Sequence, residues 1–264
     1  MFFHRNGDFA VEKHKVCAIL MVFSDPGGFV MYGKQSVASG LFPEIHVVDL
    51  HHHVLRPWCM KRRELPFAPR VLSFDFHTDT LSALSRGVTP PQNGAYSSMQ
   101  CVEDALQTLH HDEHFDWALR SGTVSQVFIC SIAPQNGAYG HEGMQVYSPD
   151  LSRGVNGIFQ DPDSCREMLD HMLSDEALLP VLSGFQEEGT PFILDLDCDF
   201  FLTEKMVDSV KSPFFSCLVR SALMITLSRE DDWVRLLRLP GEVLTADSIV
   251  HTLREQFTRI CAEK

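Results

Sequence analysis

The sequence of 264 residues has few basic residues, no long apolar run and no closely paired cysteines. Its 22 lysines and arginines face 35 acidic residues, which gives a formal net charge of −13. Such a balance disfavours nucleic acid and anionic membranes as partners, although it is also compatible with a role in solubility alone. No apolar run approaches the ~18 residues of a membrane span, and the N-terminus lacks the pattern of a signal peptide.

The eight cysteines are scattered, and no Cys-x-x-Cys pair occurs among them. This spacing excludes a zinc ribbon and gives no support to a disulfide scaffold. Cys17, Cys130 and Cys198 lie inside apolar runs and are expected to be buried free thiols. Together these features favour a cytoplasmic location.

Hydrophobic residues make up 44% of the chain, enough for a substantial core. Strand-like apolar runs alternate with helical segments, which predicts an α/β fold with a mostly parallel sheet and helices on both faces. The expected strands are 45–48, 71–76, 124–132, 191–197 and 223–227. Residues 133–160 are expected to form one long loop. We expect one domain over residues 1–264, with 1–14 poorly ordered and 15–44 forming an N-terminal extension or hairpin.

The segment Ser73–Asp79 reads Ser-Phe-Asp-Phe-His-Thr-Asp and follows an apolar run. Alternate side chains of an extended segment point the same way, so Asp75, His77 and Asp79 are expected to share one face. A single motif of this kind is also compatible with a polar strand end that binds nothing.

A second segment, Ile193–Asp199, also ends an apolar run with alternating acids. Asp195 and Asp197 are expected to share a face, together with Asp199 if the strand continues. In parallel sheets, ligand sites gather at the carboxyl ends of strands, where both segments are expected to end. So many carboxylates would repel one another unless divalent cations bound them, and oxygen ligands with a few imidazoles suit manganese better than zinc.

These motifs resemble those of the ureohydrolase superfamily, which includes arginases and agmatinases. In that superfamily the first motif supplies three manganese ligands, the second supplies two, and a histidine after an earlier strand supplies the sixth. The segment Val47–Leu55 occupies the earlier position. Its His51 matches the family position, and the neighbouring His52 and His53 leave the choice of ligand open.

The closer resemblance is to the peptide arginases, which modify ribosomally made peptides in natural product biosynthesis. That branch is similar to this chain in Phe-Asp-x-His-x-Asp (Phe74–Asp79) and in Leu-Asp-x-Asp-x-Asp-Phe-Phe (Leu194–Phe201). It also has a Ser-x-x-Asp-Asp-aromatic segment, found here as Ser228–Trp233. The resemblance spans roughly residues 45–233 and implies an arginase-like three-layer αβα fold.

The resemblance implies six ligands for two manganese ions per chain: His51, Asp75, His77, Asp79, Asp195 and Asp197. Asp75 and Asp195 would bridge the two ions. The residues expected to carry the catalytic chemistry are Asp75, His77 and Asp197. Asp199 and His53 are candidates for an additional ligand or for support of the ligands.

A guanidinium substrate needs a carboxylate whose geometry matches its fork of N–H groups. Glu230, Asp231 and Asp232 follow a late strand, and Asp231 or Asp232 is the favoured partner. A solvated turn is an equally good interpretation of this segment. His110, His111 and His114 are expected on a solvated helix face, and Trp58 and Trp117 in the core.

The expected function is manganese-dependent conversion of arginine residues in a peptide to ornithine, with release of urea. Two alternatives remain open: a ureohydrolase acting on free arginine, agmatine or another small guanidino compound, and a metal-stabilised binding protein without turnover. A calcium loop, a haloacid-dehalogenase-type phosphatase and an arginase-fold zinc deacetylase match the motifs less well. The calcium loop, for example, would need a glycine where Phe200 stands.

Overall fold

The computed structural model describes residues 18–24, 28–34, 42–87, 92–133, 140–148, 161–185 and 191–263. Contacts divide the chain into two compact units. The smaller unit contains an antiparallel hairpin of β1 (Ala18–Ser24) and β2 (Gly28–Lys34), which confirms the predicted N-terminal hairpin. Cys17 and residues 1–14 lie outside the described residues. The assignment of one domain to the whole chain stays a prediction.

The larger unit is built on a six-stranded sheet in which every strand is parallel to its neighbours. In spatial order the strands are β3 (Glu44–Val48), β8 (Met224–Ser228), β7 (Phe192–Asp197), β4 (Arg70–Asp75), β5 (Gln126–Ser131) and β6 (Met144–Tyr147). All except β6 coincide with predicted apolar runs, because strands covered on both faces need nearly continuous apolar sequence. The predicted α/β class is confirmed.

The prediction of one long loop over residues 133–160 is wrong. This range contains β6, an edge strand of four residues that pairs with β5. The strand was missed because it is short and because Gln145 is exposed, which leaves little apolar pattern. Residues 134–139 and 149–160 lie outside the described residues.

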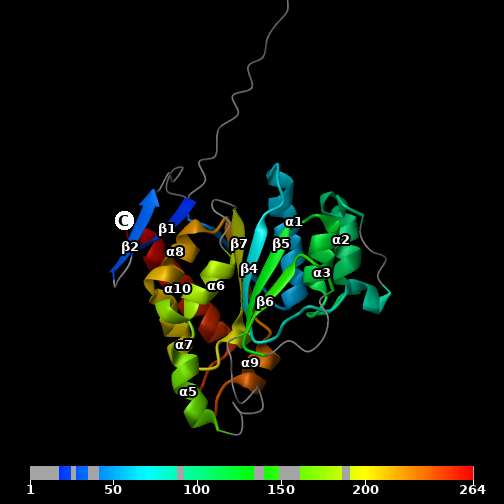
Figure 1. The fold of residues 1–264 in the computed structure, drawn as a ribbon. Helices are drawn as coiled ribbons and strands as arrows, with labels where there is room; N and C mark the ends of the chain where they lie inside the picture. The colour runs from blue at the N-terminus through cyan, green and yellow to red at the C-terminus, as the bar shows by residue number, and fades with distance from the viewer. Residues whose placement is uncertain are drawn as a thin grey trace, which may run out of the picture. The chain divides into compact units, whose positions relative to one another are not determined.

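Helices cover both faces of the sheet and make the larger unit a three-layer αβα structure (Figure 1). One layer contains α1 (Leu55–Glu64), α2 (Met99–Leu106) and α3 (His114–Ser121). The other contains α5 (Pro162–Asp170), α6 (Asp175–Phe185), α7 (Glu204–Asp208), α8 (Pro213–Ser221) and α10 (Ala246–Ala262). The short helix α9 (Asp231–Leu237) follows the carboxyl end of β8.

The sheet face beneath α1–α3 changes from apolar to polar along its strands. Val71 and Ile193 lie in a core that includes Trp58 and Trp117, and both tryptophans are buried as predicted. Two residues further along β4 and β7, the side chains on the same face become polar, because every second residue of a strand points to the same side. Carboxylates thus gather at the carboxyl end of this face, where parallel sheets place their ligand sites.

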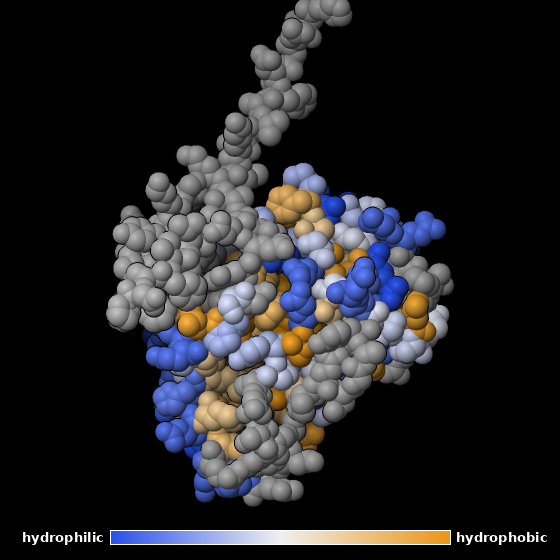
Figure 2. Space-filling view, viewed as in Figure 1, coloured by the Kyte–Doolittle hydropathy of each residue, from blue (hydrophilic) through white to orange (hydrophobic). Residues whose placement is uncertain are grey.

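Figure 2 shows hydrophilic and hydrophobic side chains interleaved on one face, with a hydrophilic margin along the outer helices α5 and α7. The large apolar side chains are mostly inside. Cys130 and Cys198 are buried free thiols, as predicted. Among the described residues, no helix combines the length and apolarity that crossing a membrane requires.

Candidate metal centre

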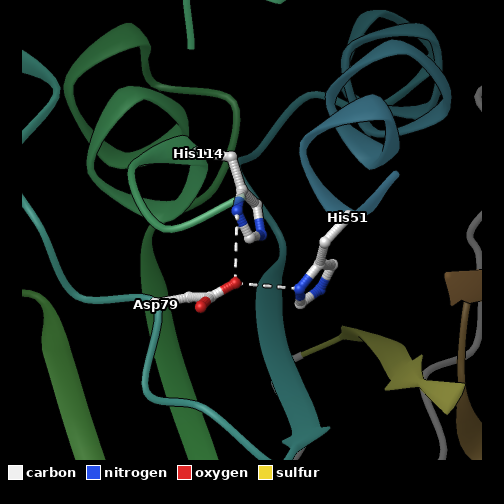
Figure 3. Close-up of side chains that lie close together, drawn as sticks. All are labelled: His51, Asp79 and His114. Atoms are coloured by element: carbon white, nitrogen blue, oxygen red, sulfur yellow. Dashed lines mark hydrogen bonds and ion pairs between the residues drawn. The ribbon is translucent and has the colours of Figure 1, made fainter. Parts of the chain in front are cut away.

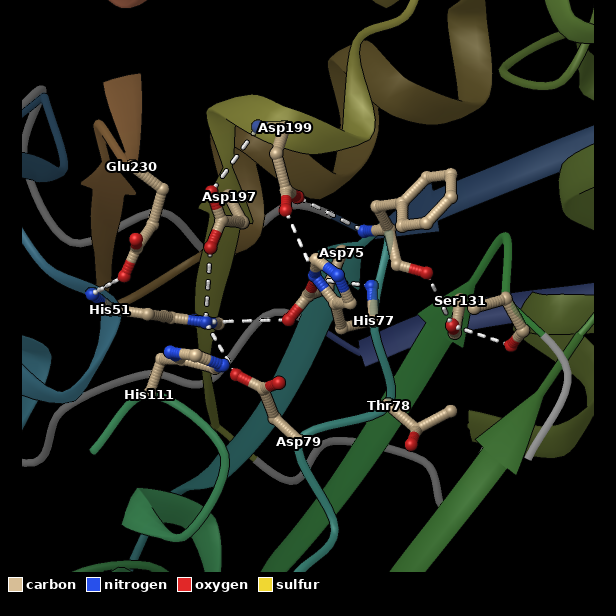
Figure 4. A network of polar contacts seen from close by, with 12 residues as sticks. His51, Asp75, His77, Thr78, Asp79, His111, Ser131, Asp197, Asp199 and Glu230 are labelled. Atoms are coloured by element: carbon tan, nitrogen blue, oxygen red, sulfur yellow. Dashed lines mark hydrogen bonds and ion pairs between the residues drawn. The ribbon is translucent and has the colours of Figure 1, made fainter. Parts of the chain in front are cut away.

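Three chain segments meet at the carboxyl ends of β3, β4 and β7 (Figure 4). The 3-10 helix η1 (His51–Val54) follows β3 and places His51 at its first position. Strand β4 ends at Asp75, and β7 ends at Asp197 before the 3-10 helix η4 (Cys198–Phe200). The convergence predicted from the order of the apolar runs is present in the structure.

His51 lies at the centre of the cluster and is fully buried. Its Nδ1 is 3.0 Å from Asp79 Oδ2, 3.1 Å from Asp197 Oδ2 and 3.3 Å from Asp75 Oδ2. Its Nε2 is 2.9 Å from Asp195 Oδ2. Four carboxylates around one buried imidazole carry more negative charge than that imidazole can balance, which is costly in the absence of a further cation.

Asp195 differs from the other carboxylates because its oxygens already have several donors. The Ser73 hydroxyl donates to Oδ2 at 2.8 Å, and the Thr226 hydroxyl donates to Oδ1 at 2.5 Å. The Trp58 indole N–H extends the network to Thr226 at 3.3 Å. A carboxylate satisfied in this way is suited to orient the His51 ring. Its contacts differ from those expected of a carboxylate that bridges two metal ions.

Asp199 takes part in a second group with Asp75 and His77. His77 Nδ1 is 2.9 Å from Asp199 Oδ2 and 3.9 Å from Asp75 Oδ1. Backbone N–H groups hold both carboxylates: that of His77 donates to Asp75 Oδ1 at 2.7 Å, and that of Phe76 to Asp199 Oδ1 at 3.2 Å. The Asp199 N–H donates to Asp197 Oδ1 at 3.2 Å. The third acid of the Asp-x-Asp-x-Asp run thus joins the site.

Three sets of described side chains bring one ligand atom each to within 4.8 Å of one another, and each set could hold a metal ion. They are His51–Asp75–Asp197, Asp75–His77–Asp199 and His51–Asp79–His114. The buried Oδ2 of Asp75 and Oδ1 of Asp79 accept no hydrogen bond. Buried carboxylate oxygens without donors are the atoms that a hard divalent cation binds. The residues therefore fit a metal centre.

Crowding changes the protonation of these groups when no cation balances them. Burial raises the pKa of Asp75 to about 8, and the charges of Asp79 and Asp199 add to the effect. Burial also raises the pKa of Asp79 to about 6 and holds that of Asp197 well above its usual range. Burial alone would lower the pKa of His51, but the nearby carboxylates outweigh it and raise this pKa. The cluster thus retains protons that a bound divalent cation would displace.

The expectation that His110, His111 and His114 form a solvated helix face is wrong for His114. Its side chain is completely buried, and its ring centroid lies 4.3 Å from that of His51. The prediction treated this region as one helical stretch, whereas residues 107–113 separate α2 from α3. His114 is the first residue of α3, so its direction is not that of the two histidines in the preceding turn.

Two residues beside the cluster have backbones in the left-handed region, Asp79 with φ 45° and Glu230 with φ 39°. They are the non-glycine residues of the described chain with this feature. The conformation costs roughly 1–2 kcal/mol for a residue with a Cβ, and such strain is concentrated at functional sites. Glu230 Oε1 accepts the His51 backbone N–H at 2.7 Å, so the strained turn also fixes the start of η1.

Several other residues of the segment Val47–Leu55 lie outside the three groups. His52 is buried and His53 half-buried, and neither contributes to a group. Burial and the neighbouring histidines lower the pKa of His52 to about 4. The exposed carboxylate of Asp49 lies 3.5 Å from the guanidinium of Arg229. Of the three consecutive histidines, His51 is the one that faces the carboxylates.

The three acids expected to hold a guanidinium are placed differently from one another. Asp231 forms an ion pair with Arg235 and accepts the Ala246 N–H at 3.3 Å, near the start of α10. Asp232 is exposed on the first turn of α9. Glu230 is buried and contacts the site through His51. Among the described contacts of these acids, that of Glu230 is the one that reaches the metal centre.

One side of the site is accessible to solvent. The His77 side chain is 28% exposed, whereas those of its carboxylate partners are buried. The Trp233 ring centroid lies 4.9 Å from that of His77, and the His111 centroid 6.2 Å from it. These three rings form the rim of the site.

No protein-family model matches this chain, and no curated protein matches it. The α/β fold and a buried histidine–aspartate cluster able to hold a metal ion are established by the structure itself. The resemblance to peptide arginases is carried by the motifs and stays a prediction.

Proposed function

We propose that this protein is a hydrolase of the peptide arginase type, which uses two manganese ions to convert arginine residues of a peptide to ornithine and urea. The observation that carries the proposal is the position of Asp75. This carboxylate belongs both to the group with His51 and Asp197 and to the group with His77 and Asp199. Two cation sites that share a carboxylate are adjacent, as the two metal ions of a binuclear hydrolase are.

The side chains that would hold the two ions are His51, Asp75, Asp79, Asp197, His77 and Asp199. Asp199 here takes the place that the sequence motif gave to Asp195. Asp195 instead would orient His51 from behind, as carboxylates commonly do for metal-binding histidines. A set with four carboxylates and two imidazoles is rich in hard oxygen ligands, and this favours manganese.

Two cations held in this way would lower the pKa of a bound water toward neutrality. In the net reaction, water adds to the guanidinium carbon, the bond from that carbon to the side-chain nitrogen breaks, and the leaving amine takes up a proton. The chain's own contribution is to fix the ligands. The backbone N–H groups of Phe76 and His77 hold Asp199 and Asp75, and both groups lie beside the exposed rim.

A guanidinium entering over His77 would meet the face of Trp233 and the negative charge of the cluster. Trp233 is half-buried at the rim, and an aromatic face attracts a cation. Glu230 is the favoured carboxylate partner, because Asp231 is engaged by Arg235 and Asp232 is exposed. The Glu230 charge is close enough to contribute to the raised pKa of Asp197.

The test is urea release by the manganese-loaded full chain with free arginine, agmatine and arginine-containing peptides. We expect urea from peptides, and ornithine residues in the same peptides by mass spectrometry. Asp75→Asn should abolish urea release, whereas Asp104→Asn, at an exposed position on α2, should not. If free arginine were turned over faster than every peptide, the substrate would be a small guanidino compound and not a peptide. Metal binding without any urea would contradict the hydrolase and leave a binding protein.

A further inference from the structure

We propose that His114 is a further metal ligand, which makes one end of the site more selective for zinc or cobalt over manganese than the other end. With His51 and Asp79 it forms a set of two imidazoles and one carboxylate. The inference rests on the metal centre of the proposed function and is independent of the substrate.

The geometry places His114 next to two residues of the centre (Figure 3). Its ring centroid is 4.3 Å from that of His51, and its Nδ1 is 3.9 Å from Asp79 Oδ2. One ligand atom from each of the three side chains lies within 4.8 Å of the other two. All three side chains are buried, so water does not compete for these atoms.

The hydrogen bonds of His114 determine which ring nitrogen is free. Nδ1 lies 2.6 Å from the backbone carbonyl oxygen of His111. A carbonyl oxygen only accepts, so Nδ1 carries the proton and Nε2 of the neutral ring has a lone pair. Nε2 is buried and has no hydrogen-bond partner, and Figure 3 draws it on the side of the ring toward His51.

A nitrogen in this state is unfavourable unless something binds it. A buried polar atom without a partner costs roughly 1–3 kcal/mol. Histidines that bind metals usually donate their other N–H to a backbone carbonyl or a carboxylate, which is the bond that His114 already makes.

Packing alone is the competing explanation. The His114 ring lies 4.0 Å from the Phe115 ring and 5.9 Å from that of Trp58, centroid to centroid. An apolar side chain would fill this space without leaving a buried lone pair. The packing therefore accounts for the position of the ring and not for the buried Nε2 without a partner.

The donor set indicates the class of metal. With His114, the end around His51 has two imidazoles beside its carboxylates. Pairs of imidazoles with a carboxylate are common in zinc sites, and affinity for nitrogen-containing sites rises from Mn²⁺ through Co²⁺. The group Asp75–His77–Asp199 has one imidazole and two carboxylates and suits Mn²⁺ better. The two ends of the centre should therefore differ in metal preference.

The experiment compares His114→Asn and His114→Gln with the parent chain. An asparagine amide can still donate to the His111 carbonyl but has no atom at the Nε2 position, whereas glutamine places a weak ligand there. The matched control is His110→Gln, because His110 is exposed and lies in the segment between α2 and α3. The metal-free full chains are titrated with Co²⁺, followed by visible absorption, and then with Zn²⁺ in competition.

We expect the parent to bind one Co²⁺ tightly and a second less tightly. His114→Asn should weaken the tight step at least tenfold and change its visible spectrum, His114→Gln should be intermediate, and the control should match the parent. A folded His114→Asn protein with the parent's affinity and spectrum would overturn the proposal.

A measurement on the unaltered chain serves if the variants fail to fold. With ¹⁵N-labelled histidine, the first equivalent of Zn²⁺ should shift the ring nitrogen resonances of two histidines. A shift of one histidine alone overturns the role of His114. If Co²⁺ and Zn²⁺ bind as expected but no urea is released, the proposed function is contradicted and the role of His114 as a ligand is not.

Discussion

The two ends of the metal centre differ in their exposure to solvent. At the sealed end, defined by His51, Asp79 and His114, no residue is more than 4% exposed. At the open end, defined by His77 and Trp233, the histidine side chain is 28% exposed and the tryptophan half-buried. One end is thus built to retain a cation out of water, and the other gives a substrate access to the second cation.

The difference follows from the elements that supply each residue. His51 lies in η1, between the sheet and α3, where the Phe115 ring packs edge-on at 5.6 Å from it. His77 lies in the loop after β4, opposite α9 at the ends of the strands. Asp75 belongs both to a group with His51 and to a group with His77. Its substitution should therefore affect both ends, whereas substitutions of other residues should affect one end.

The largest effect is expected for Asp75→Asn. This change removes the shared ligand, so metal content should fall from two ions per chain toward none, and urea release should fall to background. Without metal, the variant should nevertheless be more stable at pH 8 than the metal-free parent, by on the order of 1–3 kcal/mol, because a crowded buried carboxyl is removed. Metal analysis and urea denaturation measure the two quantities. Retention of both ions would contradict the shared role.

Glu230→Gln should have the next largest effect, and it probes how the open end recognises a cation. Glutamine keeps an acceptor for the His51 N–H, so metal content should not change. The loss of charge should lower kcat/KM. The corresponding loss of transition-state stabilisation should be on the order of 2–4 kcal/mol, as for a charge pair that loses one partner. Asp232→Asn is the control and should have near-normal kinetics. If Asp232→Asn lowered kcat/KM and Glu230→Gln did not, the carboxylate that binds the guanidinium would be Asp232 on α9.

The pH dependence of metal-free stability should distinguish the cluster from the rest of the protein. The folded-state pKa of Asp75 is about 8, so the native carboxyl keeps a proton that the unfolded chain releases above about pH 4. For His77 burial lowers the pKa, but the hydrogen bond with Asp199 raises it to about 9. Both groups therefore contribute stability that is lost as the pH rises through these values.

His52 acts in the opposite direction, since its pKa of about 4 causes a loss of stability as the pH falls below 6.5. The unfolding free energy of the metal-free protein should decrease from pH 6.5 to 8.5 by on the order of 1–3 kcal/mol. With manganese bound the slope should be smaller or reversed, because the metal binds deprotonated ligands. Urea denaturation at several pH values, with and without manganese, measures both slopes. Equal slopes in the two conditions would show that the cluster is not the metal site.

The sequence predicted the fold and the meeting of the motifs because both depend on simple periodicities. Nearly continuous apolar runs marked the buried parallel strands, and alternation placed the acids of each strand on one face. Since parallel strands end at the same edge, the motifs around Asp75 and Asp197 had to converge there. The edge strand β6 was not predicted because it is short and only partly buried.

Alternation could not decide which acids of the second motif face a metal, because Asp195, Asp197 and Asp199 all share one parity. Asp195 and Asp197 lie at different depths along β7, and Asp199 lies beyond its end in η4, so their surroundings depend on neighbouring elements. Ser73 and Thr226 supply hydroxyl donors to Asp195, and nothing in the local sequence of β7 reveals them. The burial of His114 could not be predicted for a related reason, because the direction of its side chain depends on where α3 begins.

The smallest effect is expected at the rim, where Trp233→Leu removes an aromatic face from the open end. A cation–π contact at a partly exposed site contributes about 1 kcal/mol, so KM for an arginine peptide should rise about fivefold, with kcat and metal content unchanged. Trp58 provides the matched comparison at the buried side of the centre. There Trp58→Leu loses the N–H donor to Thr226 and leaves a cavity in the core, so it should lower stability by about 3 kcal/mol or more. If Trp233→Leu instead lowered stability as Trp58→Leu does, or lowered metal content, its ring would be a structural support of His77, and the open end would lack the cation-binding face proposed for it.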